Sequence, residues 1–206
     1  MLKKLVRQNR SYRRFDGTVR ITKTQINRML ELARLCPSAA NLQQLRFFYS
    51  ITPKFNNLIF PHLSWAAYLK DWSGPKHGEQ PTGYILILGP IKISKHLLID
   101  VGIAAQTILL GAAELGLGGC QIASMNKHKL HKALNLPADL EVILVLALGK
   151  PVEQVTIEKV IDPEDIENLA IAYRWLIEQP YVDPSRSGLL GTCVGGSFAM
   201  MAAASP

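Results

Sequence analysis

The longest apolar stretch of the chain, Leu97 to Leu117, constrains the fold more than any other feature. It is long enough to cross a membrane, but it carries Asp100, Gln106 and Glu114, whose polar groups would find no partners in a bilayer. We therefore interpret it as a core helix that ends at the glycines of residues 116–119. Because its hydrophobic residues lie on almost every side, we expect it to be buried all round, partly in a subunit interface.

Size and composition indicate a folded intracellular protein. The 206 residues suffice for one well-buried core, or for one domain plus a fragment of another. They are 48% hydrophobic and 19% charged, which excludes a disordered chain. Cys36, Cys120 and Cys193 lack the spacing of metal ligands, so we expect reduced thiols, no metal site and a cytoplasmic location. Two lysines interrupt the apolar residues at the start of the chain, which is not the pattern of a secretory signal.

Hydrophobic periodicity predicts an α+β fold. Helices and strands alternate over the first 160 residues, but without the regular strand–helix–strand repeat of a parallel sheet. The expected helices cover residues 2–9, 22–36 (capped by Thr22 or Thr24), 63–72, 95–116 and 127–134, and the expected strands cover residues 47–51, 84–88, 120–123 and 142–148.

The first candidate binding segment is residues 9–15, Asn-Arg-Ser-Tyr-Arg-Arg-Phe. The guanidinium groups of Arg10 and Arg13 and the hydroxyl of Ser11 suit the oxygens of a phosphate. Seven cationic residues face a single acid, Asp16, within the first twenty positions, and such a patch also attracts nucleic acid. No nucleic-acid motif accompanies it, so a compact anionic ligand is the simpler explanation, and a solvated basic segment is the alternative.

The second candidate segment is residues 36–43, Cys-Pro-Ser-Ala-Ala-Asn-Leu-Gln. Pro37 ends the preceding helix, and the side-chain amides of Asn41 and Gln43 can read the polar edge of a heterocycle. The two alanines before Asn41 let the main chain approach a flat ring. An ordinary helix-ending turn is the alternative. If both segments serve one ligand, they contact the two ends of a phosphorylated planar cofactor, within one subunit or between two.

In this order and spacing, the two segments and the Gly-Leu-Gly-Gly of residues 116–119 resemble the nitroreductase family of FMN-dependent oxidoreductases. The resemblance covers about residues 1–160. It implies a central mixed sheet flanked by helices, and a homodimer with FMN at the interface. It also implies NADH or NADPH as electron donor, with nitroaromatic, quinone or similar electron-poor acceptors. No catalytic side chain is implied, since FMN carries the chemistry. The cofactor-binding residues implied by position are Arg10, Ser11, Tyr12, Arg13, Pro37, Ser38, Ala39, Asn41, Gln43, Ala123, Ser124 and Lys150.

The chain departs from the family pattern in two places. Gln44 stands where the family usually has proline. Beyond Asp165 the expected C-terminal segment is absent, so a flavin-binding protein with little turnover is an alternative function. Trp65, Tyr68 and Trp72 either wall the substrate space or fill the core.

The composition changes near residues 161–168, which divides the chain into a domain of residues 1–162 and a tail of residues 163–206. In the tail we expect a helix, a short strand and a helix. Its Gly-Thr-Cys-Val-Gly at residues 191–195 fits a nucleophile elbow, and the tail resembles a fragment of a dienelactone-hydrolase-like α/β-hydrolase. A hydrolase based on Cys193 also needs an acid and a histidine after the nucleophile, and residues 194–206 contain neither. We expect an incomplete fragment, either a genuine fusion or an artefact.

Overall fold

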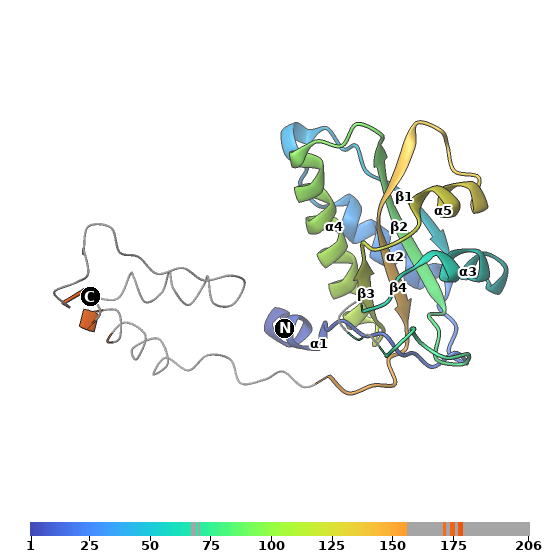
Figure 1. The fold of residues 1–206 in the computed structure, drawn as a ribbon, viewed down its shortest axis with the longest axis horizontal. Helices are drawn as coiled ribbons and strands as arrows, with labels where there is room; N and C mark the ends of the chain where they lie inside the picture. Colours follow the sequence, from blue (N-terminus) through green and yellow to red (C-terminus); the bar gives the residue numbers. More distant parts are fainter. Residues whose placement is uncertain (67–68, 70, 156–170, 172–173, 176, 179–206) are drawn as a thin grey trace. The chain divides into compact units, whose positions relative to one another are not determined.

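The computed structural model describes residues 1–66, 69, 71–155, 171, 174–175 and 177–178 (Figure 1). Met1–Val155 form one unit of the chain and Thr156–Pro206 a second. The predicted boundary at residues 162–163, the nucleophile elbow and Cys193 lie outside the described residues, and so does Tyr68. The fold and the candidate site therefore concern the first unit.

A four-stranded antiparallel sheet runs through this unit in the order β1-β2-β4-β3. Its strands are β1 (Arg46–Ser50), β2 (Gly83–Pro90), β3 (Gly118–Ile122) and β4 (Leu140–Gly149). The two central strands, β2 and β4, are buried along nearly their whole length, as their continuous apolar sequences predict. The α+β class is confirmed. The four strands pair antiparallel where a mixed sheet was expected, and one parallel bridge, Ser11 to Gly119, joins the first candidate segment to β3.

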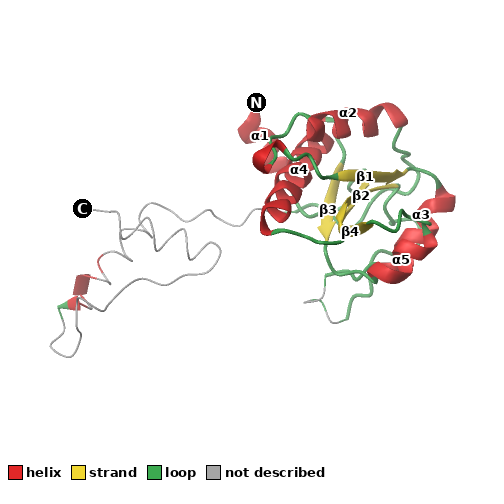
Figure 2. Ribbon diagram, turned by 90° about the horizontal axis from the view of Figure 1, so that it is seen from above, coloured by secondary structure: helices red, strands yellow, loops and turns green. Residues whose placement is uncertain are grey.

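Helices cover both faces of the sheet (Figure 2). One face carries α2 (Lys23–Arg34) and α4 (Lys95–Glu114), and the other carries α3 (Pro53–Ile59) and α5 (Lys127–Ala133). Alternate residues of the strands point to opposite faces of the sheet and pack into two hydrophobic clusters, one beneath each helical layer. The remaining helical elements are the short α1 (Leu2–Gln8), η1 (Ala39–Asn41) and η2 (Phe60–His62).

The cap of α2 is the one that its sequence predicts. Thr22 is the N-cap, and its hydroxyl accepts a hydrogen bond from the backbone N–H of Gln25 at 3.2 Å. The Gln25 side chain accepts one from the backbone N–H of Thr22 at 2.9 Å, which completes a capping box. The helix then buries Ile26, Met29 and Ala33 against α4 and the sheet. Thr22 rather than Thr24 therefore sets the start of α2.

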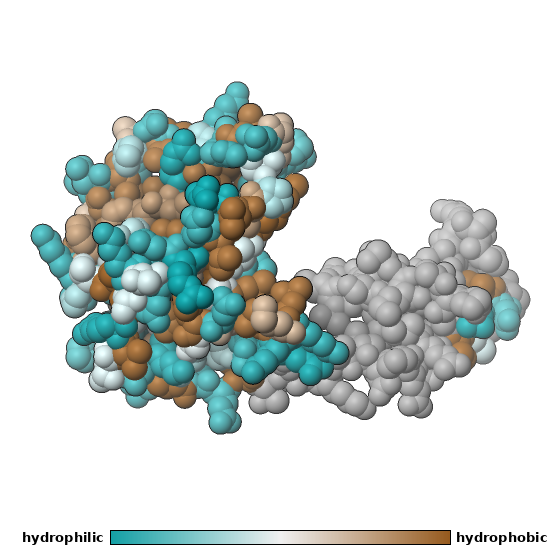
Figure 3. All heavy atoms as spheres, turned by 180° about the vertical axis from the view of Figure 1, so that it is seen from behind, coloured by the Kyte–Doolittle hydropathy of each residue, from teal (hydrophilic) through white to brown (hydrophobic). Residues whose placement is uncertain are grey.

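Helix α4 is a core helix, but it is not buried on every side. It is long and apolar enough to cross a membrane by length and composition, yet 56% of its apolar window is buried inside this unit. Ser94 caps it through the backbone N–H of Leu97. Leu98 and Ile99 are 52% and 60% exposed, so the expectation of all-round burial is wrong for a single chain. Hydrophobic patches also reach the surface elsewhere in this unit (Figure 3).

The predicted helix over residues 63–72 is wrong for the residues described there. Leu63 forms an antiparallel bridge with Met125, and Ser64 donates its N–H to the carbonyl of Ser124 at 2.9 Å. Trp65 is 8% exposed and packs against its aromatic neighbours. Pairing with a segment sixty residues away therefore overrides the helical spacing of these aromatic residues. Helix α3, which begins with proline at its first turn, was not predicted.

Candidate functional site

The first candidate segment, residues 9–15, follows α1 and forms backbone bridges to the sheet at two points. Ser11 bridges Gly119, and the backbone N–H of Tyr12 donates to the Gly119 carbonyl at 3.1 Å. Phe15 is fully buried and bridges Pro151, just beyond β4. The cationic residues between these points are therefore held at a defined place beside β3.

Arg10, Ser11 and Arg13 line one cavity of about 660 Å³, together with Gln121 of β3. Arg13 donates from Nη1 to the Ser11 carbonyl at 3.1 Å. Arg10 donates from Nη2 to the carbonyl of Val6, but its Nε is buried and has no hydrogen-bond partner. A buried guanidinium N–H without an acceptor is costly. The cavity thus offers the positive charge that a phosphate oxygen requires, while the Arg10 Nε lies beneath its surface without a partner.

The other nine predicted cofactor residues do not line this cavity, and four of them, Tyr12, Ala123, Ser124 and Lys150, belong to neither candidate turn nor cavity. Tyr12 donates its hydroxyl to the Gln8 carbonyl at 2.9 Å, and Lys150 donates its Nζ to the Gly116 carbonyl at 3.1 Å. Ala123 and Ser124 are exposed in the segment after β3. Of the residues predicted to bind the phosphate, the structure brings Arg10, Ser11 and Arg13 to the cavity.

The second candidate segment forms a turn with unusual backbone conformations. Ala40, Asn41 and Gln43 have φ values of 49°, 53° and 48°. These values lie in the left-handed region, which is unfavourable for alanine and glutamine and persists only where the surroundings hold it. The Asn41 side-chain carbonyl accepts a hydrogen bond from Gln43 Nε2 at 2.8 Å, and both residues are exposed. Both amides are therefore presented at the surface.

Two side chains hold this turn. The carboxylate of Asp100, in the second turn of α4, accepts a hydrogen bond from the backbone N–H of Ala39 at 3.0 Å. The hydroxyl of Ser38 accepts one from the backbone N–H of Gln43 at 3.0 Å. Asp100 is only 6% exposed, so its carboxylate is a buried anchor rather than a surface charge. A charged acceptor makes this the stronger of the two contacts.

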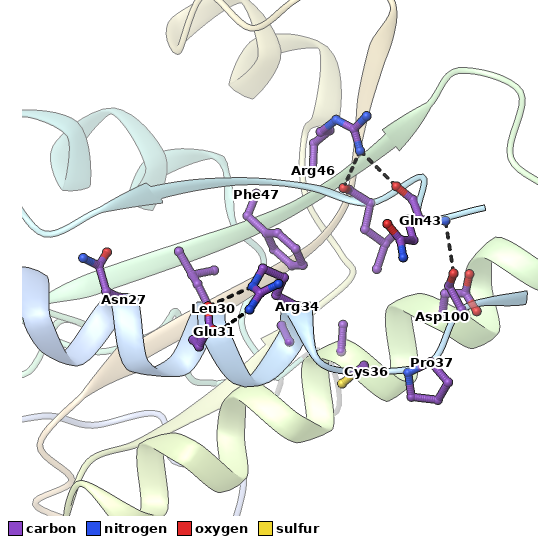
Figure 4. A pocket seen from close by; sticks show the side chains of 14 residues that line it. Asn27, Leu30, Glu31, Arg34, Cys36, Pro37, Gln43, Arg46, Phe47 and Asp100 are labelled. Carbon is purple, nitrogen blue, oxygen red and sulfur yellow. Dashed lines mark hydrogen bonds and ion pairs between the residues drawn. The ribbon is translucent and has the colours of Figure 1, made fainter. Parts of the chain in front are cut away.

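Pro37, Ser38 and Gln43 line a second cavity, of about 620 Å³, between α2, β1 and α4 (Figure 4). Figure 4 shows Pro37, Gln43 and Asp100 at the same end of it. Ala39 and Asn41 do not line it. The turn thus presents its polar groups beside a hollow whose walls are partly apolar.

The two cavities lie on different sides of α4. Asp100 and Ala104 border the second cavity, whereas Gln106 and Leu109 border the first. From Asp100 to Gln106 the helix advances about 9 Å and turns by about 240° beyond one full revolution. Within a single chain, Arg10 and the turn therefore share no cavity among those that the described residues line, and the expected convergence on one ligand does not occur there.

Asp100 and Glu153 are site residues that sequence reasoning missed. In the sequence, Asp100 stands out only as a carboxylate within an apolar stretch. Glu153 lines the first cavity, and its Oε1 accepts hydrogen bonds from the backbone N–H groups of Arg13 and Arg14. No local signal marks either residue, because each acts on a segment distant in sequence.

Neither a metal cluster nor an accessible Cys120 thiol is found in the part of the chain that the structure describes. The described residues hold no cluster of three or more His, Cys, Asp or Glu side chains that could bind a metal. Cys120 is 3% exposed, and burial raises the pKa of its thiol to about 12. Burial also raises the pKa of Tyr84, with the neighbouring Cys120 as a second cause. Cys120 is therefore a small residue of the core.

Comparisons with known proteins identify what this chain is similar to. Residues 6–150 match the model described as "Nitroreductase family". The protein named "Putative NAD(P)H nitroreductase YodC" of Bacillus subtilis (strain 168) is 24% identical, in a match that covers 69% of this chain and 86% of the relative.

Solved structures share the fold. A nitroreductase family protein from Clostridium novyi NT has a TM-score of 0.61 and 22% identity, covering 74% of this chain and 86% of that one. A protein titled a putative nitroreductase in complex with FMN, from Exiguobacterium sibiricum 255-15, has a TM-score of 0.64 and 20% identity, covering 81% of this chain and 95% of that one.

Proposed function

Because the chain belongs to the nitroreductase family, we propose that it is an FMN-dependent oxidoreductase that passes electrons from NADH or NADPH to nitroaromatic, quinone or similar electron-poor acceptors. The observation that carries the proposal is the cavity that Arg10, Ser11 and Arg13 line together beside β3. The relative from Bacillus subtilis is named for NAD(P)H, and the Exiguobacterium structure holds FMN. Both support the choice of donor and cofactor.

The chain's own residues would bind and orient the cofactor. Arg10 and Arg13 would hold the phosphate by charge-assisted hydrogen bonds, with Ser11 completing the shell. The left-handed turn would bring the amides of Asn41 and Gln43 to the polar edge of the ring, and Asp100 would keep the turn in place. When bound, FMN supplies the ring that accepts a hydride and returns electrons to the second substrate. We also propose that seven further residues contact the cofactor: Tyr12, Pro37, Ser38, Ala39, Ala123, Ser124 and Lys150.

We further propose a homodimer in which each flavin site takes its phosphate half from one chain and its ring half from the other. Two observations support it. The halves line separate cavities on different sides of α4 within one chain. The exposed face of α4 carries Leu98 and Ile99, apolar side chains that a second copy would cover.

An absorption spectrum of the purified protein tests the proposed function. After incubation with FMN and removal of excess, the account expects bound flavin absorbance that bleaches on addition of NADH or NADPH under anaerobic conditions and returns with a quinone. Flavin that binds but does not bleach would favour the alternative of a flavin-binding protein with little turnover. A protein that takes up no FMN would refute both.

A further inference from the structure

The first cavity already contains a carboxylate at the place where the proposed function puts a phosphate. Glu153 lines it beside Arg10, Ser11 and Arg13. Its Oε1 accepts hydrogen bonds from two consecutive backbone N–H groups, those of Arg13 and of Arg14, the latter at 3.2 Å. Two consecutive N–H groups therefore converge on one carboxylate oxygen. This anion belongs to the protein itself.

The backbone holds Glu153 in this position. Phe15 bridges Pro151, and Val152 donates its N–H to the carbonyl of Arg14 at 3.2 Å. The segment after β4 therefore runs antiparallel to the cationic segment and delivers the next residue, Glu153, to its amide groups.

The negative charge of Glu153 reduces the net positive charge that the cavity offers to an anionic ligand. Arg10 and Arg13 contribute two positive charges, and Glu153 offsets one of them. A phosphate that enters either displaces the carboxylate from the N–H groups or lies beside a like charge in a partly enclosed space. Either effect weakens the binding of the phosphate. A ligand without a phosphate group is not affected.

We propose that Glu153 competes with a bound phosphate for the positive charge of Arg10 and Arg13. It thereby lowers the affinity for phosphorylated flavin and keeps the flavin exchangeable. The inference rests on the proposed function for the identity of the ligand, but the competition itself concerns any phosphate. Glu153 is a specificity-determining residue in this account, because it reduces the preference for FMN over riboflavin.

Glu153→Gln is the direct test, because glutamine keeps an oxygen that can accept from the N–H groups but carries no charge. Glu141→Gln is the matched control: it changes the net charge equally, and Glu141 pairs with Lys127 of α5 at 2.7 Å, on the opposite face of the sheet from α4. Dissociation constants of inorganic phosphate would be measured by calorimetry at low salt, and those of FMN and riboflavin by flavin fluorescence.

We expect Glu153→Gln to bind phosphate and FMN roughly five- to tenfold more tightly than the parent protein, with riboflavin and the Glu141→Gln control unchanged. Equal or weaker binding of phosphate by Glu153→Gln would overturn the inference and make Glu153 an anchor of the loop alone. Glu153→Asp, which keeps the charge, should bind phosphate no more tightly than the parent. If phosphate behaves as expected but no variant binds FMN, the proposed function fails while the competition stands.

Discussion

Replacing Asp100 with alanine probes how the turn of the candidate site is held. The Asp100 carboxylate is 6% exposed and accepts the Ala39 N–H at 3.0 Å. A hydrogen bond to a charged acceptor contributes roughly 1.5–3 kcal/mol. Relaxation of Ala40 from its left-handed conformation returns about 1–2 kcal/mol. The net loss in unfolding free energy should therefore be only about 1 kcal/mol, which lowers Tm by about 2–4 °C.

The same substitution should affect flavin binding more than stability. In Asp100→Ala the turn must return to its left-handed conformation when FMN binds, so the roughly 1–2 kcal/mol released by its relaxation is lost from the affinity, which raises Kd about five- to thirtyfold. Urea unfolding and an FMN fluorescence titration measure the two quantities. Asp139→Ala, at an exposed aspartate, should change neither. Unchanged FMN affinity in Asp100→Ala would show that other contacts hold the turn and would refute this reasoning.

Two further predictions concern the scaffold. Thr22→Ala removes half of the capping box and should lower the unfolding free energy by about 1 kcal/mol without changing FMN affinity; an unchanged urea midpoint would contradict the role of the cap. Cys120 should resist iodoacetamide at pH 8 in the folded protein and react once urea unfolds it, as peptide mass spectrometry would reveal. Because burial raises the Cys120 pKa from 9.0 to about 12, its contribution to stability is present below pH 9 and is lost as the pH rises towards 12. Rapid labelling of folded Cys120 would contradict this burial.

The elements that could be predicted are those whose signals are local. The capping residue Thr22 and the terminating Pro37 bracket α2 within the sequence itself, and the apolar length of residues 97–117 identifies α4. The cationic segment could be recognised as an anion site because Arg10 and Arg13 are close in sequence.

What could not be predicted depends on contacts between distant residues. Leu63 lies in a sequence with helical spacing, but it forms an antiparallel bridge with Met125 instead. The Asp100 carboxylate accepts a hydrogen bond from the Ala39 N–H, 61 positions away in the sequence. The Glu153 carboxylate accepts one from the Arg13 N–H, 140 positions away. The division of the site by α4 is a property of how the helix packs, which neither segment encodes alone.

Subunit complementation tests the central claim, that one flavin takes its phosphate half from one chain and its ring half from another. Arg10→Gln would disable the first half, and the double variant Asn41→Ala, Gln43→Ala the second. In a mixed dimer the unaltered halves meet at one of the two sites, so random exchange restores about a quarter of the FMN sites. Unfolding and refolding the two variants together, then titrating FMN, gives the answer. The account predicts that fraction of tight sites in the mixture and none in either variant alone; no recovery in verified mixed dimers would contradict it.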